Sequence, residues 1–330
     1  MNLYKNDYFN LNDIYKADMV FNIAIGGRGT GKTFNTLDFL IENNIPFLFL
    51  RRSLTQLDLI TSTDSMSPVE PIANMRGFNY EIQKINKYLF KIIVNDEFKG
   101  YMSALTTFAN LRGFDMSNIK VLVFDEFIPE KGEKTIKNEN VIFFNAYETI
   151  NRNRELKGEK ALKVFLLSNA NTLDSLILDD LGVINYIYKM QKMGQEVYID
   201  DKKSILFANL KKSKISELKS QTALYKAQNN KAFNDMAIAN DFFFDDSDIK
   251  SCKVNCKNFI TSIDDVAIYD IGDKLYFCKF KKRPCYSSEN DIDKFNIKIF
   301  LYPYRKRFFK KQCLFSSLEI KLKVFRLFDL

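Results

Sequence analysis

The sequence predicts an α/β fold in which helices cover both faces of a mostly parallel sheet. Three observations support this prediction. The motif GGRGTGKT (26–33) lies between a short apolar run and a segment of helical periodicity. Apolar runs of strand length alternate with helical segments along the first 170 residues. These runs are apolar at nearly every position, which is typical of parallel strands buried on both faces.

The first predicted strand, loop and helix carry the glycine motif. Residues 19–25 (MVFNIAI) predict a buried strand, residues 33–44 a helix, and residues 46–52 (PFLFLRR) a second strand. The pattern G-x-x-x-x-G-K-[ST] binds nucleotide phosphates when it follows a strand and opens a helix. We therefore interpret residues 26–33 as the phosphate-binding loop (P-loop) of an NTPase.

Four further segments continue the alternation. Residues 80–94 show partial alternation and aromatic enrichment, which favours a β-hairpin. Residues 119–127 (IKVLVFDEF) and 161–171 (ALKVFLLSNAN) predict buried strands that end in polar residues, and residues 138–155 predict a helix.

The composition changes near residue 195, and we place the end of the ATPase domain (1–195) there. Residues 196–235 are rich in Lys, Ser, Gln and Asn with weak helical periodicity, so we expect a linker or a small helical subdomain. Short strand-like runs return from residue 254, which predicts a smaller β-containing domain over 236–330.

Composition excludes several functions. The longest apolar runs are too short to cross a bilayer, so we expect no membrane partner. The chain contains no histidine, which excludes any mechanism that needs an imidazole base. Five cysteines, an odd number, indicate reduced thiols in a cytosol. Cys252 and Cys256 are four residues apart, but the lack of histidine and of two close thiol pairs argues against zinc.

The P-loop residues predict ATP and Mg²⁺ as cofactors. Glycines let successive backbone N–H groups converge on phosphate oxygens without Cβ clashes. Lys32 can neutralise the β- and γ-phosphates, and the Thr33 hydroxyl can ligate Mg²⁺. The predicted nucleotide-binding residues are Gly26, Gly27, Arg28, Gly29, Thr30, Gly31, Lys32 and Thr33.

Asp125 and Glu126 end a predicted strand and form the second candidate site. Asp125 would face the Mg²⁺ side of the phosphates, and Glu126 could polarise the attacking water. The alternative is a pair of solvated acids at a strand end. Together with the P-loop, the pair favours ATP hydrolysis over phosphoryl transfer to a small molecule.

Asn169 and one of two arginines are further candidates for catalysis. Asn169 follows a buried strand and could contact the γ-phosphate or the water, or could cap the next helix. Arg152 and Arg154 come at the end of the predicted helix 138–155. A guanidinium there could reach the nucleotide of a neighbouring subunit as an arginine finger, or could form a surface ion pair.

Basic residues concentrate in the C-terminal part. Residues 201–330 hold 26 Lys and Arg against 16 Asp and Glu, and the segment YPYRKRFFKK (302–311) mixes basic with aromatic residues. This pattern favours a nucleic-acid partner. The candidate contacts there are Arg305, Lys306 and Arg307. The loop 129–138 offers Lys131, Lys134 and Lys137 for phosphates, although Glu130 and Glu133 make a plain solvated loop equally plausible.

The motifs together resemble a known family. GGRGTGKT is similar to the ATP site of the large-terminase ATPases of tailed phages. The set GGRGTGKT, FLRR, VFDEFI, NRNRE and LLSNA, over residues 19–172, resembles the DNA-packaging ATPases of small phi-29-like podophages. The resemblance implies an additional-strand P-loop fold, a homo-oligomeric ring of five subunits, Arg152 as the finger acting in trans, and Arg28 as a nucleotide sensor.

The resemblance also has implications for the partners and for the C-terminal domain. It implies double-stranded DNA driven into an empty procapsid in the host cytoplasm, with the ring transiently at the capsid portal; a structural packaging RNA stays open. Large terminases carry an RNase H-like nuclease, of which the small packaging ATPases resemble a shortened form without cutting. The candidate acids for a remaining metal site are Asp241, Asp245, Asp246, Asp264, Asp265 and Asp270. We favour the alternative that these are solvated acids in turns and at strand ends.

The sequence thus predicts an ATP-driven motor that packages a phage genome. Three alternatives stay open: another nucleic-acid-dependent ATPase of helicase-like or replication type, a nucleotide-dependent assembly adaptor, and a small-molecule kinase. An adaptor would need neither Glu126 nor Arg152, and a kinase would not need the basic C-terminal region.

Overall fold

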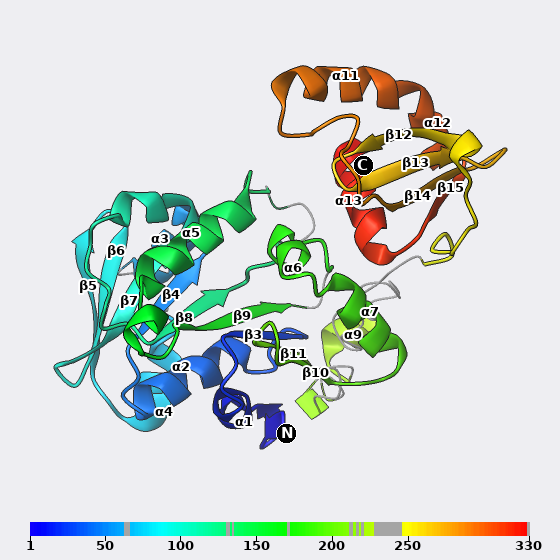
Figure 1. Ribbon diagram of the computed structural model, residues 1–330. Coiled ribbons are helices and arrows are strands. Elements are labelled where there is room, and N and C mark those ends of the chain that lie inside the picture. The colour runs from blue at the N-terminus through cyan, green and yellow to red at the C-terminus, as the bar shows by residue number, and fades with distance from the viewer. Residues whose placement is uncertain are drawn as a thin grey trace. The chain divides into compact units, whose positions relative to one another are not determined.

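The computed structural model describes residues 1–62, 67–129, 133, 135–169, 172–210, 214–215, 218, 221–227 and 246–328. The chain forms two compact units (Figure 1): residues 1–181 with 189–243, and residues 182–188 with 244–330. The first unit holds a nine-stranded sheet and the second a four-stranded sheet. Among the described residues, no helix is both long and apolar enough to cross a membrane.

Six neighbouring strands of the large sheet run parallel, and the predicted strands at 19–25, 46–52, 119–127 and 161–171 are confirmed among them. Nearly all their residues are buried, as the continuous apolar runs predict. In spatial order they are β11 (Ile205–Leu210), β3 (Phe21–Gly26), β9 (Lys163–Asn169), β8 (Val121–Asp125), β4 (Phe47–Arg51) and β7 (Glu97–Ala104).

Antiparallel strands extend the sheet at both ends. β10 (Val197–Asp200) pairs with β11 at one end. At the other end, β6 (Leu89–Val94) pairs with β7, and β5 (Tyr80–Asn86) pairs with β6. The predicted hairpin over 80–94 is therefore confirmed.

The predicted linker over 196–235 is wrong for its first part. β10 and β11 both lie in it, and β11 is fully buried beside β3. The apolar run ILFANL is only six residues long and has lysines on both sides in the sequence, so the polar composition of the surrounding segment concealed it. The sheet of the first unit therefore continues fifteen residues past the predicted domain end at residue 195.

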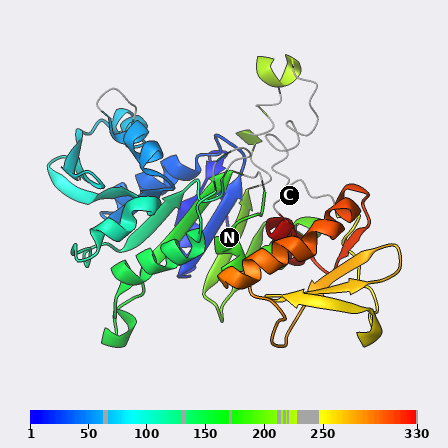
Figure 2. The same cartoon turned by 90° about the horizontal axis from the view of Figure 1, so that it is seen from above.

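Helices cover both faces of the sheet (Figures 1 and 2). One face carries α1 (Leu11–Lys16), α2 (Lys32–Glu42) and α4 (Glu70–Arg76), next to the small hairpin of β1 (Tyr4–Lys5) and β2 (Tyr8–Phe9). The same face carries α3 (Leu54–Thr61), whose Leu57 belongs to one core cluster with Leu37 and Ile72. The other face carries the 3₁₀ helix η1 (Leu105–Leu111), α5 (Glu139–Asn151) and α6 (Leu176–Leu181). The short elements η2 (Glu155–Lys157) and α9 (Ala223–Ala227) also belong to the first unit, and α7 (Ile184–Lys192) is divided between the two units after Tyr188.

Helix α2 shows why the P-loop is held firmly. Leu37, Leu40 and Ile41 have helical spacing, are buried, and belong to one core cluster with Ala24 of β3 and Phe165 of β9. Burying such side chains contributes about 1.5–3 kcal/mol each. The loop between β3 and α2 is therefore fixed at both ends.

Helix α5 is shorter than predicted. It ends at Asn151, not at residue 155, because Arg152 adopts a left-handed backbone conformation (φ 50°, ψ −135°). A turn and η2 follow, and the Arg154 side chain points into the protein, where it is buried.

The second unit is built on the sheet order β12-β13-β14-β15. Its first three strands are antiparallel and β15 is parallel to β14. The strands are β12 (Phe259–Ile263), β13 (Val266–Asp270), β14 (Leu275–Lys279) and β15 (Cys313–Phe315). The helices are η3 (Cys256–Asn258), α11 (Asp291–Leu301), η4 (Tyr302–Tyr304), α12 (Arg305–Phe309) and α13 (Leu318–Phe328).

Aromatic residues fill the core of this unit. Phe277, Phe315 and Phe328 are buried together, and the Phe308 ring packs 4.3 Å from the Phe328 ring, centroid to centroid. The unit differs from the predicted domain over 236–330 because it also includes residues 182–188, and residues 228–245 lie outside the described part.

Candidate nucleotide-binding site

Two glycines of the P-loop are required by local geometry. A Cβ on Gly26 would lie 2.6 Å from Cβ of Leu210 on β11, so a larger residue would push the two parallel strands apart. Gly31 has φ 82°, which L side chains rarely adopt, and a Cβ there would lie 2.5 Å from Nδ2 of Asn35. The loop therefore keeps its shape only with glycine at both positions.

Lys32 is buried at the centre of the loop. Its Nζ donates hydrogen bonds to the carbonyl oxygens of Gly27 (2.8 Å) and Gly26 (3.0 Å) and to Oγ1 of Thr30 (3.3 Å). It also donates to Oδ1 of Asn169 at 3.4 Å. Because Asn169 ends β9, next to β3, the structure brings this predicted residue directly to the P-loop.

Thr33 and Asp125 meet at the same edge of the sheet. The Thr33 hydroxyl donates to Oδ1 of Asp125 at 2.8 Å. The carboxyl ends of β3 and β8 lie on either side of β9, which is the edge where ligands of parallel α/β sheets bind. A hydroxyl and a carboxylate are the hard oxygen ligands that Mg²⁺ prefers, so this pair fits the predicted metal.

Arg51, at the end of β4, holds both acids. Its Nη1 donates to Oδ2 of Asp125 at 2.7 Å and its Nη2 donates to Oε2 of Glu126 at 2.6 Å. Glu126 has φ 53°, which turns its side chain from the strand direction toward the pocket. Sequence reasoning noted the FLRR motif but gave Arg51 no role; its position at the end of the strand next to β8 was the available signal.

Arg52, the next residue, binds two other acids. Its Nε donates to Oε1 of Glu139 at 2.8 Å, and its Nη1 donates to Oε2 of Glu133 at 3.2 Å. Burial raises the pKa of the Glu139 carboxyl, while the Arg52 guanidinium opposes that shift. Gln56 also donates to Glu133, at 3.3 Å. From the sequence we considered Glu133 only as an acid that offsets the loop lysines, but its side chain lines the pocket beside the P-loop.

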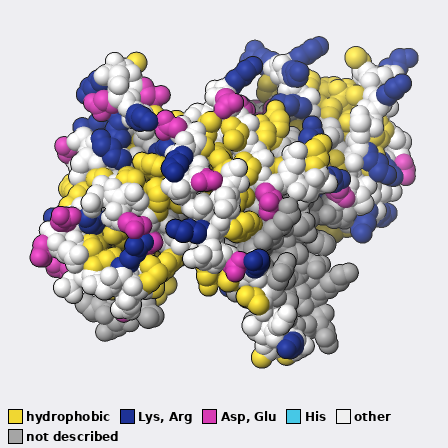
Figure 3. All heavy atoms as spheres, turned by 90° about the horizontal axis from the view of Figure 1, so that it is seen from below, with side chains coloured by type: hydrophobic (Ala, Val, Ile, Leu, Met, Phe, Trp, Pro, Cys, Tyr) yellow, Lys and Arg dark blue, Asp and Glu magenta, His cyan; other side chains and the backbone are white. Residues whose placement is uncertain are grey.

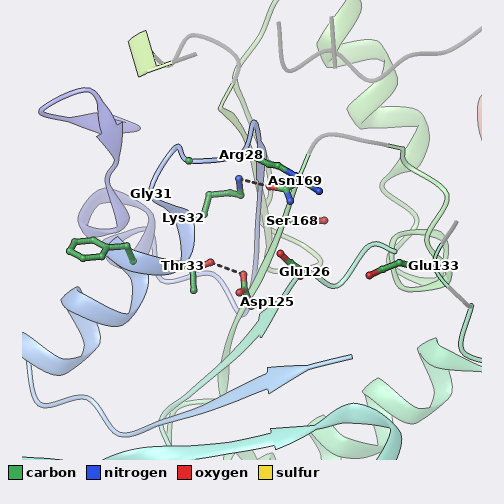
Figure 4. Close-up of a pocket in the computed structure, with 11 residues that line it drawn as sticks. Arg28, Gly31, Lys32, Thr33, Asp125, Glu126, Glu133, Ser168 and Asn169 are labelled. Carbon is green, nitrogen blue, oxygen red and sulfur yellow. Dashed lines mark hydrogen bonds between the residues drawn. The ribbon is translucent and has the colours of Figure 1, made fainter. Parts of the chain in front are cut away.

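The P-loop, the two acids after β8 and the end of β9 line one pocket of about 550 Å³ (Figure 4). The volume suits a triphosphate with its ion. The predicted residues Gly29 and Gly31 also line it, while Thr30 is buried behind the loop and its hydroxyl donates to the Gly27 carbonyl at 3.0 Å. The predicted site residues whose side chains line the pocket are Arg28, Lys32, Thr33, Asp125, Glu126 and Asn169.

Arg152 lies elsewhere on the same unit. It does not line the pocket, its side chain is 50% exposed, and its Nη1 lies 3.6 Å from Oδ1 of Asp115. Arg154 is the inward member of the pair, with 6% exposure, and its Nη2 donates to the carbonyls of Ser117 (3.0 Å) and Ile119 (2.7 Å). Of the two arginines, only Arg152 is exposed to solvent.

The sequence of the chain matches the model of one protein family. The family model described as podovirus DNA encapsidation protein (Gp16) matches residues 3–269 of the chain. The chain belongs to this family. The resemblance found in the motifs is thereby confirmed, and the mixed α/β fold with its large, mainly parallel sheet agrees with it.

The relatives are distant in sequence but close in fold. The DNA packaging proteins of Bacillus phages PZA and phi29 are each 24% identical over 176 residues, which is 50% of this chain and 47% of theirs. The match to these curated relatives thus spans about half their length. Among solved structures, the Phi-28 gp11 DNA packaging motor is similar over 99% of both chains (TM-score 0.67, 19% identity). The phi-29 genome packaging motor assembly is similar over 98% of both (TM-score 0.62, 18% identity).

The candidate nucleic-acid residues differ in their surroundings. Lys131 and Lys134 lie outside the described residues, and Lys137 is exposed in the turn before α5. Arg305 donates to the Phe328 carbonyl at 2.6 Å, and Arg307 to Oδ2 of Asp270 at 3.4 Å. Both arginines therefore hold the second unit together, in addition to any contact they make outside it.

Exposed cations remain available on the same segment. Lys306, Lys310 and Lys311 are all exposed around α12. The space-filling view from below shows Lys and Arg side chains interspersed with hydrophobic and acidic ones, so the face drawn there is not uniformly basic (Figure 3). A polyanion contact would thus depend on a local cluster of lysines.

The described acids of the second unit have partners of their own. Asp265 accepts a hydrogen bond from Lys323 (2.8 Å), Asp264 from the Ser288 amide (2.9 Å) and Asp246 from the Tyr188 hydroxyl (2.7 Å). Asp241 and Asp245 lie outside the described residues. Within the described part, no three His, Cys, Asp or Glu side chains group closely enough to hold a metal ion.

Proposed function

We propose that this chain is the ATP-hydrolysing subunit of a motor that moves double-stranded viral DNA into a preformed procapsid. The observation that carries the proposal is the contact of Thr33 with Asp125 beside Glu126, in the phosphate pocket of a chain from the encapsidation family. Two distant relatives are named DNA packaging proteins, and the structures of similar fold are packaging motors.

The pocket has the groups that hydrolysis of a nucleoside triphosphate needs. Lys32 and the loop amides would bind the phosphates, and Arg28 would contact them from the pocket wall. Thr33 and Asp125 would hold Mg²⁺, which supplies positive charge to the phosphate oxygens when bound. The Glu126 carboxylate, which Arg51 contacts at Oε2, could accept a proton from the attacking water. The bond that breaks joins the γ-phosphorus to the β–γ bridging oxygen, giving ADP and phosphate.

The proposal includes a ring of subunits. Arg152 is exposed and lies outside its own pocket, as a residue that stabilises charge on a neighbour's nucleotide must. We infer that the ring has five subunits, docks at the capsid portal in the host cytoplasm, and holds DNA in its centre. A packaging RNA would be an additional partner at the basic C-terminal unit.

One measurement tests the function directly. ATP turnover is measured with and without double-stranded DNA, together with the particle size in solution. The motor predicts an oligomer whose turnover rises with DNA of any sequence. A helicase-like ATPase would instead separate the strands of a forked duplex, and an assembly adaptor would bind ATP without repeated turnover.

A further inference from the structure

The turn that carries Arg152 is fixed to the protein at several points. The Asn151 side chain is buried, and its Oδ1 accepts a hydrogen bond from the Leu162 amide at 2.7 Å. The Arg152 amide donates to the Glu148 carbonyl at 2.8 Å, and the Arg154 carbonyl accepts from the amides of Lys157 and Glu159 at 2.9 Å each. A left-handed residue between such contacts has little freedom to relax.

Arg154 connects this turn to a second segment. Its Nη2 donates to the carbonyls of Ser117 and Ile119, which lie just before β8. The same segment carries Asp115, whose carboxylate accepts hydrogen bonds from the amide (3.1 Å) and the hydroxyl (3.2 Å) of Ser117. One buried guanidinium thus sets the distance between the backbone that carries Arg152 and the backbone that carries Asp115.

Asp115 and Arg152 face each other in the solvent. Their closest side-chain atoms are 3.6 Å apart, with 71% and 50% of the side chains exposed. A contact of this kind is weak, so a stronger anion can displace Asp115 from Arg152. A nucleotide phosphate is such an anion, and Arg binds it through two parallel N–H groups.

We propose that Arg154 is a positioning residue for Arg152. Asp115 binds the Arg152 guanidinium until a neighbouring subunit presents its nucleotide, which then displaces Asp115. The inference rests on the proposed role of Arg152 in trans. Arg154 contributes no group to the reacting atoms. It fixes the position of the turn that carries Arg152 relative to the segment that carries Asp115, so that the Arg152 side chain projects outward at a fixed place.

The test uses the full-length chain with Arg154→Leu, with Arg154→Lys as the conservative variant, and with Arg112→Leu as a matched control. Arg112 is an exposed arginine after η1. Displacing a catalytic group by about 1 Å costs on the order of 100-fold in rate, so Arg154→Leu should slow turnover to that extent. Binding of a fluorescent ATP analogue should stay unchanged, and Arg154→Lys should restore part of the rate, since an ammonium can donate to both carbonyls.

Mixed assemblies separate positioning from a defect in the subunit's own pocket. Arg154→Leu subunits mixed with Glu126→Gln subunits should recover turnover, since the second supplies an intact Arg152 to the first. Arg154→Leu mixed with Arg152→Ala should not recover. If Arg152→Ala with Glu126→Gln recovers while Arg154→Leu with Glu126→Gln does not, positioning by Arg154 is overturned and the finger stands. If neither recovers, the role of Arg152 in trans falls, and the positioning inference with it.

A second variant tests whether Asp115 competes with the nucleotide for Arg152. Asp115→Asn keeps the contacts with Ser117 but removes the charge that competes for Arg152. Turnover should rise about two- to fivefold at low salt, and the rise should vanish at high salt, because exposed ion pairs are weak and screened. Unchanged or lower turnover at low salt would show that Asp115 does not compete with the nucleotide for Arg152.

Discussion

The hydroxyl of Thr33 donates a 2.8 Å hydrogen bond to Oδ1 of Asp125, 92 residues further along the chain. The contact joins the first turn of α2 to the last residue of β8, although another strand lies between β3 and β8. It places two oxygen ligands at one point of the pocket, with Glu126 as the next residue. The consequences of changing the groups around this contact can be measured one by one.

We expect Glu126→Gln to bind ATP as the unchanged chain does but to hydrolyse it about 10²–10⁴-fold more slowly. The amide cannot accept the proton of the water, yet its oxygen can still accept the hydrogen bond from Arg51. Single-turnover hydrolysis and the affinity for a fluorescent ATP analogue check this. An equal loss of affinity would contradict the role of Glu126 as base.

Arg51→Met should destabilise the first unit, and a bound nucleotide with Mg²⁺ should compensate in part. Asp125 has only 7% of its side chain exposed, and losing a hydrogen bond between charged groups costs about 1.5–3 kcal/mol. Positive charge from the ion would replace the lost guanidinium. Melting temperatures with and without Mg²⁺ and ADP measure this, with Arg112→Met as the control. A deficit that is the same in both conditions would rule out the compensation.

Arg152→Ala and Glu126→Gln subunits should each be slow alone and faster when mixed. One interface of a mixed ring can join an intact Glu126 to an intact Arg152 of the next subunit. Turnover is followed as a function of mixing ratio, with ring formation checked by particle size. Rings that form but recover no turnover at any ratio would assign Arg152 a role within its own chain.

The lysines around α12 should control the salt dependence of nucleic-acid binding. Replacing Lys306, Lys310 and Lys311 with Gln should lower the slope of log affinity against log salt by about 0.9 for each lost contact with duplex DNA. Basal ATP turnover should not change, because these residues belong to the second unit.

The arginines of the same segment should behave differently. Arg305→Gln and Arg307→Gln remove contacts to the Phe328 carbonyl and to Asp270, so they should lower the melting temperature of the second unit. The lysine variant should leave that temperature unchanged. If the lysine variant kept its full salt slope, α12 would not be a polyanion contact.

Part of the stabilisation that Arg76 gives to the first unit should depend on the charge of Glu42. Its guanidinium makes two hydrogen bonds each to Asp38 and Glu42 of α2, and it lowers the pKa of Glu42 below the ordinary value near 4.5. A depressed carboxyl pKa stabilises the fold above the ordinary value and stops doing so as the pH falls through the folded value.

The variant Arg76→Met therefore has a pH-dependent effect. We expect a loss of about 0.5–1 kcal/mol at neutral pH, since the pair is partly exposed. The difference from the unchanged chain should shrink as the pH falls below about 4. Urea unfolding at several pH values measures it, and a difference that stays constant down to pH 3 would disprove the linkage to Glu42.

Local sequence patterns predicted the parts of the site that lie within one element and its loop. The P-loop, Asp125 and Glu126 could be located because a glycine motif or an acidic pair directly follows a continuous apolar strand. The partners of Arg51 could not, since they depend on β4 lying next to β8, and no local pattern specifies the order of strands in a sheet.

The end of α5 shows a second limit. NRNRE continues a helical pattern, and only the left-handed backbone of Arg152 separates the outward arginine from the buried Arg154. The cause is tertiary: the carbonyls of Ser117 and Ile119 accept the Arg154 guanidinium, and the sequence around residue 152 contains no sign of them.

The place of β11 beside β3 affects how the protein can be made. The Val20 amide donates a hydrogen bond to Oγ of Ser204, 184 residues further along the chain. Strand β3, which leads into the P-loop, therefore lacks its neighbour β11 until the ribosome has produced residue 210. At typical elongation rates the delay is roughly 10–40 s. During that time the nascent chain exposes an unpaired apolar strand edge, which can pair with other chains. The yield of active protein therefore depends on how quickly residues 197–210 emerge and close the sheet.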